Sequence, residues 1–225
     1  MERPVTLPCA EIETAPKPVH AVIWLHGLGA DGNDFAPIIP QLVDPAWPAL
    51  RFVFPHAPPR PVTVNGGVRM RAWYDIAGMR IEDKQDSAGL RESIGHVEAL
   101  IAREVERGVA ARHILLAGFS QGGAVVLAAG LRHAQPLAGI VALSTYLMLG
   151  EQLAKEGSVA NARLPIFFGH GSHDPVVPQP LGAAARDALT TRGHAVAWHS
   201  YPMTHQVCLE EIADLRAWIG AHLFT

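Results

Sequence analysis

Residues 114–131 read ILLAGFSQGGAVVLAAGL, and this stretch decides the fold. Its apolar start, Ile114–Ala117, is typical of a buried strand, and Ala124–Leu131 is compatible with a helix. Between them, Gly118-Phe119-Ser120-Gln121-Gly122 matches G-x-S-x-G in the strand–turn–helix setting that this motif requires. The turn is so tight that the residues two before and two after Ser120 must lack side chains. The pattern predicts a strained, exposed Ser120 at a helix N-terminus, where the dipole favours negative charge. The alternative is a glycine-rich turn that packs a helix on a sheet.

Short apolar runs alternate with amphipathic segments along the rest of the chain. The runs end at Gly, Pro or Ser, as the doubly buried strands of a parallel sheet do. They are Val19–Leu25, Arg51–Phe54, His113–Ala117, Gly139–Leu143, Leu164–Phe168 and Ala195–Tyr201. The alternation predicts an α/β fold with a mostly parallel central sheet, helices on both faces and no large cap. We expect one domain over residues 1–225, because no repeat, charge block or low-complexity linker divides the chain.

The helices are predicted from apolar residues spaced three or four apart. One helix follows Asp86 or Ser87, either of which can cap its start, and ends near Gly108. Shorter apolar faces lie within 35–42 and 209–219. One segment, 61–74, breaks the pattern: Asn65-Gly66-Gly67 separates two short β-rich runs (62–64 and 68–70) and tolerates positive φ. It predicts a hairpin that leaves the edge of the sheet near the active site.

The composition narrows the class of protein. Of the 225 residues, 49% are hydrophobic and 17% charged, which excludes a disordered chain. The net charge of −3 gives no basic surface for nucleic acid. Two cysteines, Cys9 and Cys208, cannot build a disulfide framework, so we expect a reduced, cytoplasmic protein. The uncharged stretches 114–131 and 133–150 contain glycines, prolines or polar residues, and we interpret them as core and not as membrane spans.

A serine nucleophile needs a base, and the base needs an orienting acid. In this type of fold the chain order is serine, acid, histidine. His205 follows the last predicted strand, at the carboxyl end where α/β sheets place their chemistry. Asp174 follows the strand before it, and no other carboxylate lies between Glu156 and Asp187. The sequence therefore predicts a Ser120–His205–Asp174 triad.

The oxyanion of the tetrahedral intermediate needs two N–H donors. One is expected from the backbone of Gln121, the residue after the nucleophile. The other is expected from Leu28, in the glycine-rich loop after the first predicted strand. The same loop, Gly27-x-Gly29-x-x-Gly32, also fits a dinucleotide-binding pattern, but no acidic residue follows at the required place.

Two further histidines, His170 and His173, raise the possibility of a metal. A zinc site needs a third and a fourth ligand at suitable spacing, and no such pattern is present. We predict no metal and no cofactor, and we interpret both histidines as loop residues that orient Asp174.

Several motifs together resemble the phospholipase/carboxylesterase family, which includes bacterial carboxylesterases and acyl-protein thioesterases. The resemblance runs from about Val19 onward. Its motifs are WLHGLGADG at 24–32, FPHAP at 54–58, PVTVNGG at 61–67, WYD at 73–75, GFSQGGA at 118–124, HGSHDPVVP at 170–178 and YPMTH at 201–205. It implies an α/β-hydrolase fold with Ser120, Asp174 and His205 as the triad and the Leu28 and Gln121 amides as the oxyanion hole. Thr204 departs from the glycine usual before the histidine, and its β-branch restricts the backbone there.

These observations predict a serine esterase that cleaves carboxylic esters through an acyl-enzyme. An acyl-protein thioesterase or lysophospholipase would use the same residues, and a non-catalytic binding module or a peptidase is the more distant alternative. The expected partners are a small or lipid-like acyl ester or an acylated protein, with no nucleic acid and no integral membrane segment, and a homodimer is compatible. Apolar residues on loops at the active end are candidates for the acyl pocket: Leu28, Trp73, Tyr146, Leu147 and Met148.

Overall fold

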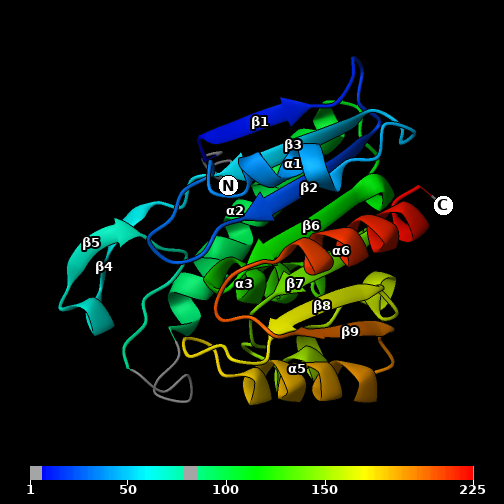
Figure 1. The fold of residues 1–225 in the computed structure, drawn as a ribbon. Coiled ribbons are helices and arrows are strands. Elements are labelled where there is room, and N and C mark those ends of the chain that lie inside the picture. Colours follow the sequence, from blue (N-terminus) through cyan, green and yellow to red (C-terminus); the bar gives the residue numbers. More distant parts are fainter. Residues whose placement is uncertain (1–6, 79–85, 225) are drawn as a thin grey trace.

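A seven-stranded sheet forms the centre of the computed structural model, which describes residues 7–78 and 86–224 (Figure 1). The strand order is β1-β3-β2-β6-β7-β8-β9. Only β1 runs antiparallel to its neighbour, and the other six strands are parallel. The strands are β1 (Cys9–Glu13), β2 (His20–Leu25), β3 (Leu50–Pro55), β6 (Ile114–Phe119), β7 (Gly139–Leu143), β8 (Ile166–Gly171) and β9 (Val196–Tyr201). The predicted α/β architecture is confirmed.

Helices cover both faces of the sheet. One face packs against α2 (Ser87–Glu106), α3 (Gln121–Gly130) and α5 (Gln179–Thr191), and the other against α1 (Ile39–Leu42) and α6 (Leu209–His222). A short α4 (Leu153–Glu156) follows β7. The predicted cap of α2 is present, because Asp86 accepts a hydrogen bond from the Gly89 amide at 2.9 Å. The helices between parallel strands lead the chain back to the amino ends of the strands, so the loops at the carboxyl ends meet along one edge.

Burial on both faces explains the uncharged stretches of the sequence. Every residue of β2 and β7 is buried, and so is every residue of α3. Residues 114–131 are therefore β6 and α3 at the centre of the core. Over the described residues, no helix is long and apolar enough to cross a membrane.

The edge strand β1 was not among the predicted strands, although its alternation of acidic and apolar residues is the period-two pattern of a half-buried strand. A buried ionic network holds this edge in place: the Arg51 guanidinium lies 2.7 Å from the buried Glu104 carboxylate and 2.8 Å from Glu13 of β1. Arg107 of the loop after α2 adds a 3.0 Å pair to Glu11. Removing one partner would leave a charge buried and unpaired, which is costly.

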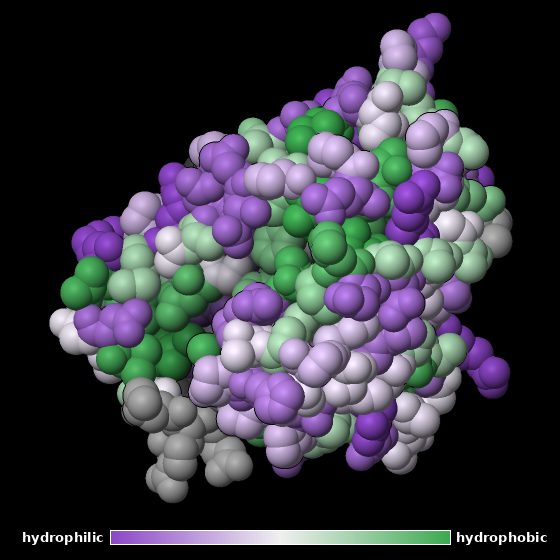
Figure 2. All heavy atoms as spheres, in the orientation of Figure 1, coloured by the Kyte–Doolittle hydropathy of each residue, from purple (hydrophilic) through white to green (hydrophobic). Residues whose placement is uncertain are grey.

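The excursion near residues 61–74 is a separate two-stranded sheet of β4 (Pro59–Val62) and β5 (Val68–Arg71). The first of the two predicted β-rich runs, 62–64, is only partly a strand. Thr63–Asn65 form a 3₁₀ turn, and the Val64 amide donates to Ile76 O. Gly66 and Gly67 have φ of 67° and 77°, as an Asn-Gly-Gly turn requires. Figure 2 shows apolar side chains gathered on this hairpin, where Val68 is 58% exposed.

Candidate active site

Ser120 lies in the tight turn between the central strand β6 and helix α3. Its φ of 54° and ψ of −119° lie outside the regions that side chains prefer. A Cβ on Gly118 would lie 2.5 Å from the Gly122 backbone, and a Cβ on Gly122 would lie 2.5 Å from Leu25 O. Glycine is therefore required on both sides of Ser120, as the sequence predicts. The Ser120 amide donates to Leu143 O at 2.9 Å, which fixes the turn to β7.

His205 bridges the serine and the acid. Its Nε2 lies 2.9 Å from Ser120 Oγ, and its Nδ1 lies 2.7 Å from Asp174 Oδ2. A carboxylate only accepts, so Nδ1 carries the proton and Nε2 is free to accept the serine proton. Asp174 follows β8 and His205 follows β9, two paired parallel strands whose carboxyl ends lie together. The three predicted residues form one hydrogen-bonded chain.

The Asp174 carboxylate is held on both oxygens. Oδ1 accepts from the amides of Val176 and Val177 at 2.8 and 2.9 Å, while Oδ2 accepts from His205. The side chain is fully buried. These bonds leave the carboxylate in one orientation toward His205.

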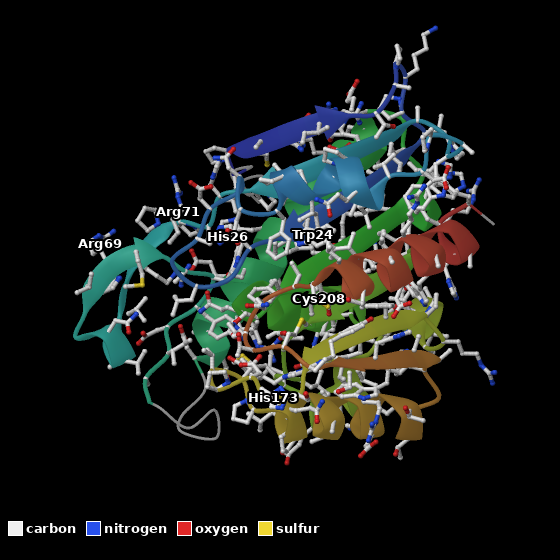
Figure 3. The ribbon with its side chains drawn as sticks, viewed as in Figure 1. Trp24, His26, Arg69, Arg71, His173 and Cys208 are labelled. Carbon is white, nitrogen blue, oxygen red and sulfur yellow. The ribbon has the colours of Figure 1, made fainter. Side chains whose placement is uncertain are left out.

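The two predicted oxyanion donors are available. The Leu28 amide makes no hydrogen bond within the described part of the chain, and Gln121 opens α3, so its amide has no carbonyl one turn earlier to bind. His26 fixes the loop that carries Leu28: its Nδ1 donates to Gly27 O at 2.7 Å and its Nε2 accepts from the Ala57 amide at 3.1 Å. Burial lowers the pKa of His26 to about 4, so the ring is neutral in this role. Figure 3 shows His26 near the hairpin residue Arg71, whose carbonyl accepts from the Gly29 amide at 2.9 Å.

The side chain of Gln121 has a role that was not predicted. Its Oε1 accepts from the Trp73 amide and its Nε2 donates to Tyr74 O, both at 2.8 Å. The turn that carries Ser120 is thus tied to the segment after the hairpin. The two residues lie 48 positions apart in the sequence, and only the fold brings them together. No local sequence pattern could therefore predict this contact.

Two of the expected acyl-pocket residues have almost no accessible surface. Trp73 is 0% and Met148 1% exposed, and the Trp73 indole donates to His26 O at 2.8 Å. Leu28 is half-buried on its loop. Tyr146 is 8% exposed, and its hydroxyl lies 2.7 Å from that of Tyr74.

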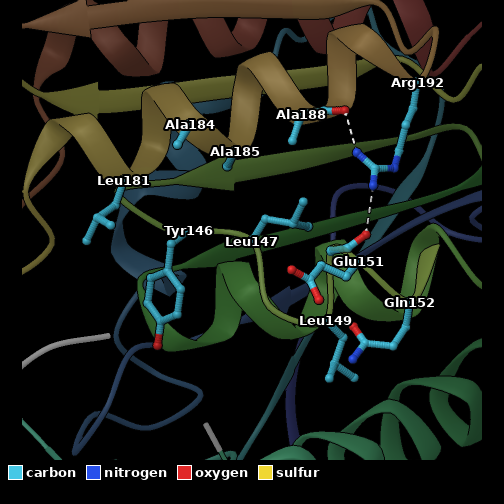
Figure 4. A pocket seen from close by; sticks show the side chains of 11 residues that line it. Tyr146, Leu147, Leu149, Glu151, Gln152, Leu181, Ala184, Ala185, Ala188 and Arg192 are labelled. Atoms are coloured by element: carbon cyan, nitrogen blue, oxygen red, sulfur yellow. Dashed lines mark hydrogen bonds between the residues drawn. The ribbon is translucent and has the colours of Figure 1, made fainter. Parts of the chain in front are cut away.

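A pocket of about 440 Å³ lies between helix α5 and the loop after β7 (Figure 4). Tyr146 and Leu147 line it together with apolar residues of α5 and two polar residues of the loop. The remaining lining residues are Leu149, Gly150, Glu151, Gln152, Leu181, Ala184, Ala185, Ala188 and Arg192. Arg192 donates to Ala188 O and to Gly150 O, both at 3.0 Å, and so joins the helix to the loop. The α5 residues were not expected, since α5 itself was not predicted.

The two histidines before the acid differ in position. His170 belongs to strand β8 and not to a loop, because pairing with β9 continues to Gly171 and Tyr201. His173 is exposed and contacts Ser172 Oγ at 3.3 Å (Figure 3). Among the residues described, no three His, Cys, Asp or Glu side chains gather as metal ligands would. Thr204 is not among the residues with positive φ, so its β-branch fits the His205 loop.

Comparison with known proteins agrees with this geometry. Residues 7–223 match the phospholipase/carboxylesterase family. The chain belongs to this family. It is 38% identical to an acyl-protein thioesterase 1 of Neurospora crassa, over 98% of this chain and 91% of the relative.

Two solved structures are also similar. Arabidopsis thaliana SOBER1 superposes with a TM-score of 0.84 at 29% identity, covering 90% of this chain and 98% of that one. Acyl-protein thioesterase 2 of Zea mays superposes with a TM-score of 0.82 at 28% identity, covering 95% and 99%. The α/β-hydrolase fold without a large cap and the carboxylic ester hydrolase activity, both predicted from the sequence, are confirmed at the level of the family.

Proposed function

We propose that this esterase works through Ser120, His205 and Asp174 by a two-step acyl transfer. His205 Nε2 takes the Ser120 proton while Oγ bonds to the carbonyl carbon of the substrate. The tetrahedral intermediate collapses, the bond to the leaving group breaks, and His205 gives its proton to the leaving alcohol or thiol. Water then attacks the acyl-enzyme by the reverse steps. The observation that carries the proposal is the single chain of hydrogen bonds from Ser120 through His205 to Asp174.

The remaining groups supply orientation and charge stabilisation. The Leu28 and Gln121 amides donate to the oxyanion, and each is worth about a hundredfold or more in rate in comparable sites. Asp174 keeps the proton on Nδ1, so the neutral His205 ring presents its Nε2 lone pair to Ser120, and it stabilises the imidazolium that forms when Nε2 takes the serine proton.

The acyl chain of the substrate lies, we propose, in the pocket between α5 and the loop after β7. The pocket begins at Tyr146 and Leu181, which follow β7 and β8 on the side of the active site, and ends at Arg192. From Leu181 to Arg192 the helical rise gives about 16 Å, enough for an extended acyl chain of medium length. Thr145, next to Tyr146, donates to Ser120 O at 2.7 Å, so the pocket mouth is fixed to the nucleophile turn.

The remaining part of the proposal concerns the leaving group, which is an alcohol in an ester and a thiol in a thioester. The acyl-protein thioesterase names of the relatives favour a thioester on a lipidated protein. The same triad chemistry also cleaves carboxylic esters, with an alcohol as the leaving group. The partners are therefore acyl esters or acylated proteins. A panel of aryl esters and matched thioesters of increasing chain length tests this: a thioesterase has a higher kcat/KM on the thioesters at every length.

Filling the pocket tests the acyl assignment. Ala184→Trp places an indole on a lining residue, and Ala183→Trp, on a neighbour outside the lining, is the control. We expect Ala184→Trp to lower kcat/KM on long-chain esters at least tenfold, at about 1.4 kcal/mol per tenfold, while acetyl esters react as before. An equal effect of both variants on all chain lengths would contradict the assignment.

A further inference from the structure

His170 is buried directly beneath the acid of the site. It is the last residue but one of β8, is 0% exposed, and its ring stacks against Trp198 with centroids 6.0 Å apart. Its Nε2 lies 3.8 Å from Asp174 Oδ2, outside hydrogen-bond distance. The proposed mechanism gives this histidine no task.

The hydrogen bonds fix the proton of His170. Nε2 lies 2.8 Å from Val177 O, and since a carbonyl only accepts, Nε2 must carry the hydrogen. Nδ1 then holds a lone pair and has no partner among the described residues. A second proton on Nδ1 would be buried without an acceptor, and burial indeed lowers the pKa of His170. The titratable groups that act on this ring are Asp174 and His205.

Val177 connects His170 to the acid. Its carbonyl accepts from His170, and its amide donates to Asp174 Oδ1 at 2.9 Å. Movement of this residue would therefore move the carboxylate that holds His205.

We propose that His170 is a positioning residue of the hydrolase: as a neutral N–H donor it fixes Val177, and through Val177 it aims Asp174 at His205. The proposal rests on the triad function proposed above. It also explains why the ring must stay neutral, because an imidazolium 3.8 Å from Asp174 Oδ2 would compete with His205 for that oxygen.

Helix α5 supports the position of the ring from the other side. Gly182 lies against Nδ1, and a Cβ there would come within 2.3 Å of it. A glycine in a helix is otherwise unfavourable, and here its missing side chain leaves room for His170. The position of the ring can therefore be tested by two independent substitutions, one at His170 and one at Gly182.

Two substitutions of His170 separate donation from packing. His170→Gln keeps an N–H near the place of Nε2, and it is neutral at every pH. His170→Phe keeps an aromatic ring against Trp198 but cannot donate. We expect kcat of His170→Phe to fall about tenfold or more with KM within twofold, and the acid limb of its pH–activity profile to move, while His170→Gln stays near wild type.

Gly182→Ala should reproduce the effect of His170→Phe, because it pushes the ring away from Val177. Gly95→Ala is the matched control: Gly95 is also within a helix, α2, but a Cβ there meets nothing within 4 Å. We expect Gly95→Ala to keep wild-type kcat.

The outcomes distinguish the two proposals. Wild-type kcat in His170→Phe, alongside an inactive Ser120→Ala, would overturn the role of His170 and leave the triad intact. An active Ser120→Ala would overturn the triad. In that case the downfield proton resonance of His205 Nδ1–H still tests His170: an unchanged signal in His170→Phe refutes the positioning role, and a shifted or lost signal supports it.

Discussion

The Trp73 amide donates to the Gln121 side chain at 2.8 Å, and this bond joins the nucleophile turn to the segment after the hairpin. The same side chain donates to Tyr74 O. Gln121 therefore combines two roles: the backbone N–H that we propose as an oxyanion donor, and a side-chain amide that ties two segments of the fold together. The two roles can be separated, because only the second depends on the side chain.

Gln121→Ala should therefore weaken the enzyme without abolishing it. The backbone donor remains, but the amide of Trp73 and the carbonyl of Tyr74 lose buried partners, at about 1–3 kcal/mol of stability. We expect kcat to fall about tenfold, far less than on loss of the nucleophile. The measurement is kcat together with urea unfolding. Gln135→Ala, at an exposed glutamine, is the control, and equal stability of the two variants would contradict the assignment.

Glu211 makes the stability of the fold depend on pH between about 4.5 and 8. It is buried in the first turn of α6 and its carboxylate oxygens have no hydrogen-bond partner among the described residues. Burial, with a contribution from Asp214, raises its pKa to about 8, so the folded state holds a proton that the unfolded chain releases near pH 4.5. This contribution is complete below pH 4.5 and is lost as the pH rises through 8.

Glu211→Gln removes the titration while keeping the shape of the side chain. We expect the variant to match wild type near pH 4 and to be several kcal/mol more stable at pH 9, with about 5 kcal/mol as the upper limit. Denaturant unfolding across this range measures the difference. Glu210→Gln, at the exposed neighbour, should follow wild type, and a wild-type profile for Glu211→Gln would contradict the burial argument.

Thr204 precedes the base, where the resemblance leads one to expect glycine. Because its φ is not positive and its hydroxyl donates to Gln206 Oε1 at 3.3 Å, the loop does not need glycine. Thr204→Gly should lower stability by about 0.5–1 kcal/mol, through greater freedom of the unfolded chain, and leave kcat within twofold. Thermal unfolding measures the change in stability, and ester turnover measures the change in kcat. A large gain in kcat would mean that the β-branch strains the His205 loop.

The sequence was informative where a local pattern sets the structure. Five of the six parallel strands are almost entirely buried, so their apolar runs predict them, while β9 at the edge of the sheet is only partly buried. The glycines at 118 and 122 predict the strained serine. Chain order and strand ends pointed to Asp174 and His205, whose side chains lie 2.7 Å apart in the structure. The strands and the serine turn are thus set by residues within a few positions of one another.

The parts that were missed depend on contacts across the fold. Strand β1 is amphipathic and stays at the edge through its ionic pairs with Arg51 and Arg107. The strand β8 continues past Gly169 because β9 pairs with it, and so His170 becomes a buried strand residue. Trp73 was expected on a pocket wall, but its amide and indole both donate to partners far along the chain, which bury it.

The most direct test of the triad is the turnover of a short aryl ester by Ser120→Ala. Ser144→Ala is the matched control, since Ser144 is also buried, follows the neighbouring strand β7 and has positive φ. We predict that Ser120→Ala loses several orders of magnitude in kcat and all labelling by a fluorophosphonate probe, while Ser144→Ala keeps both. Near-normal turnover by folded Ser120→Ala would show that the nucleophile lies elsewhere.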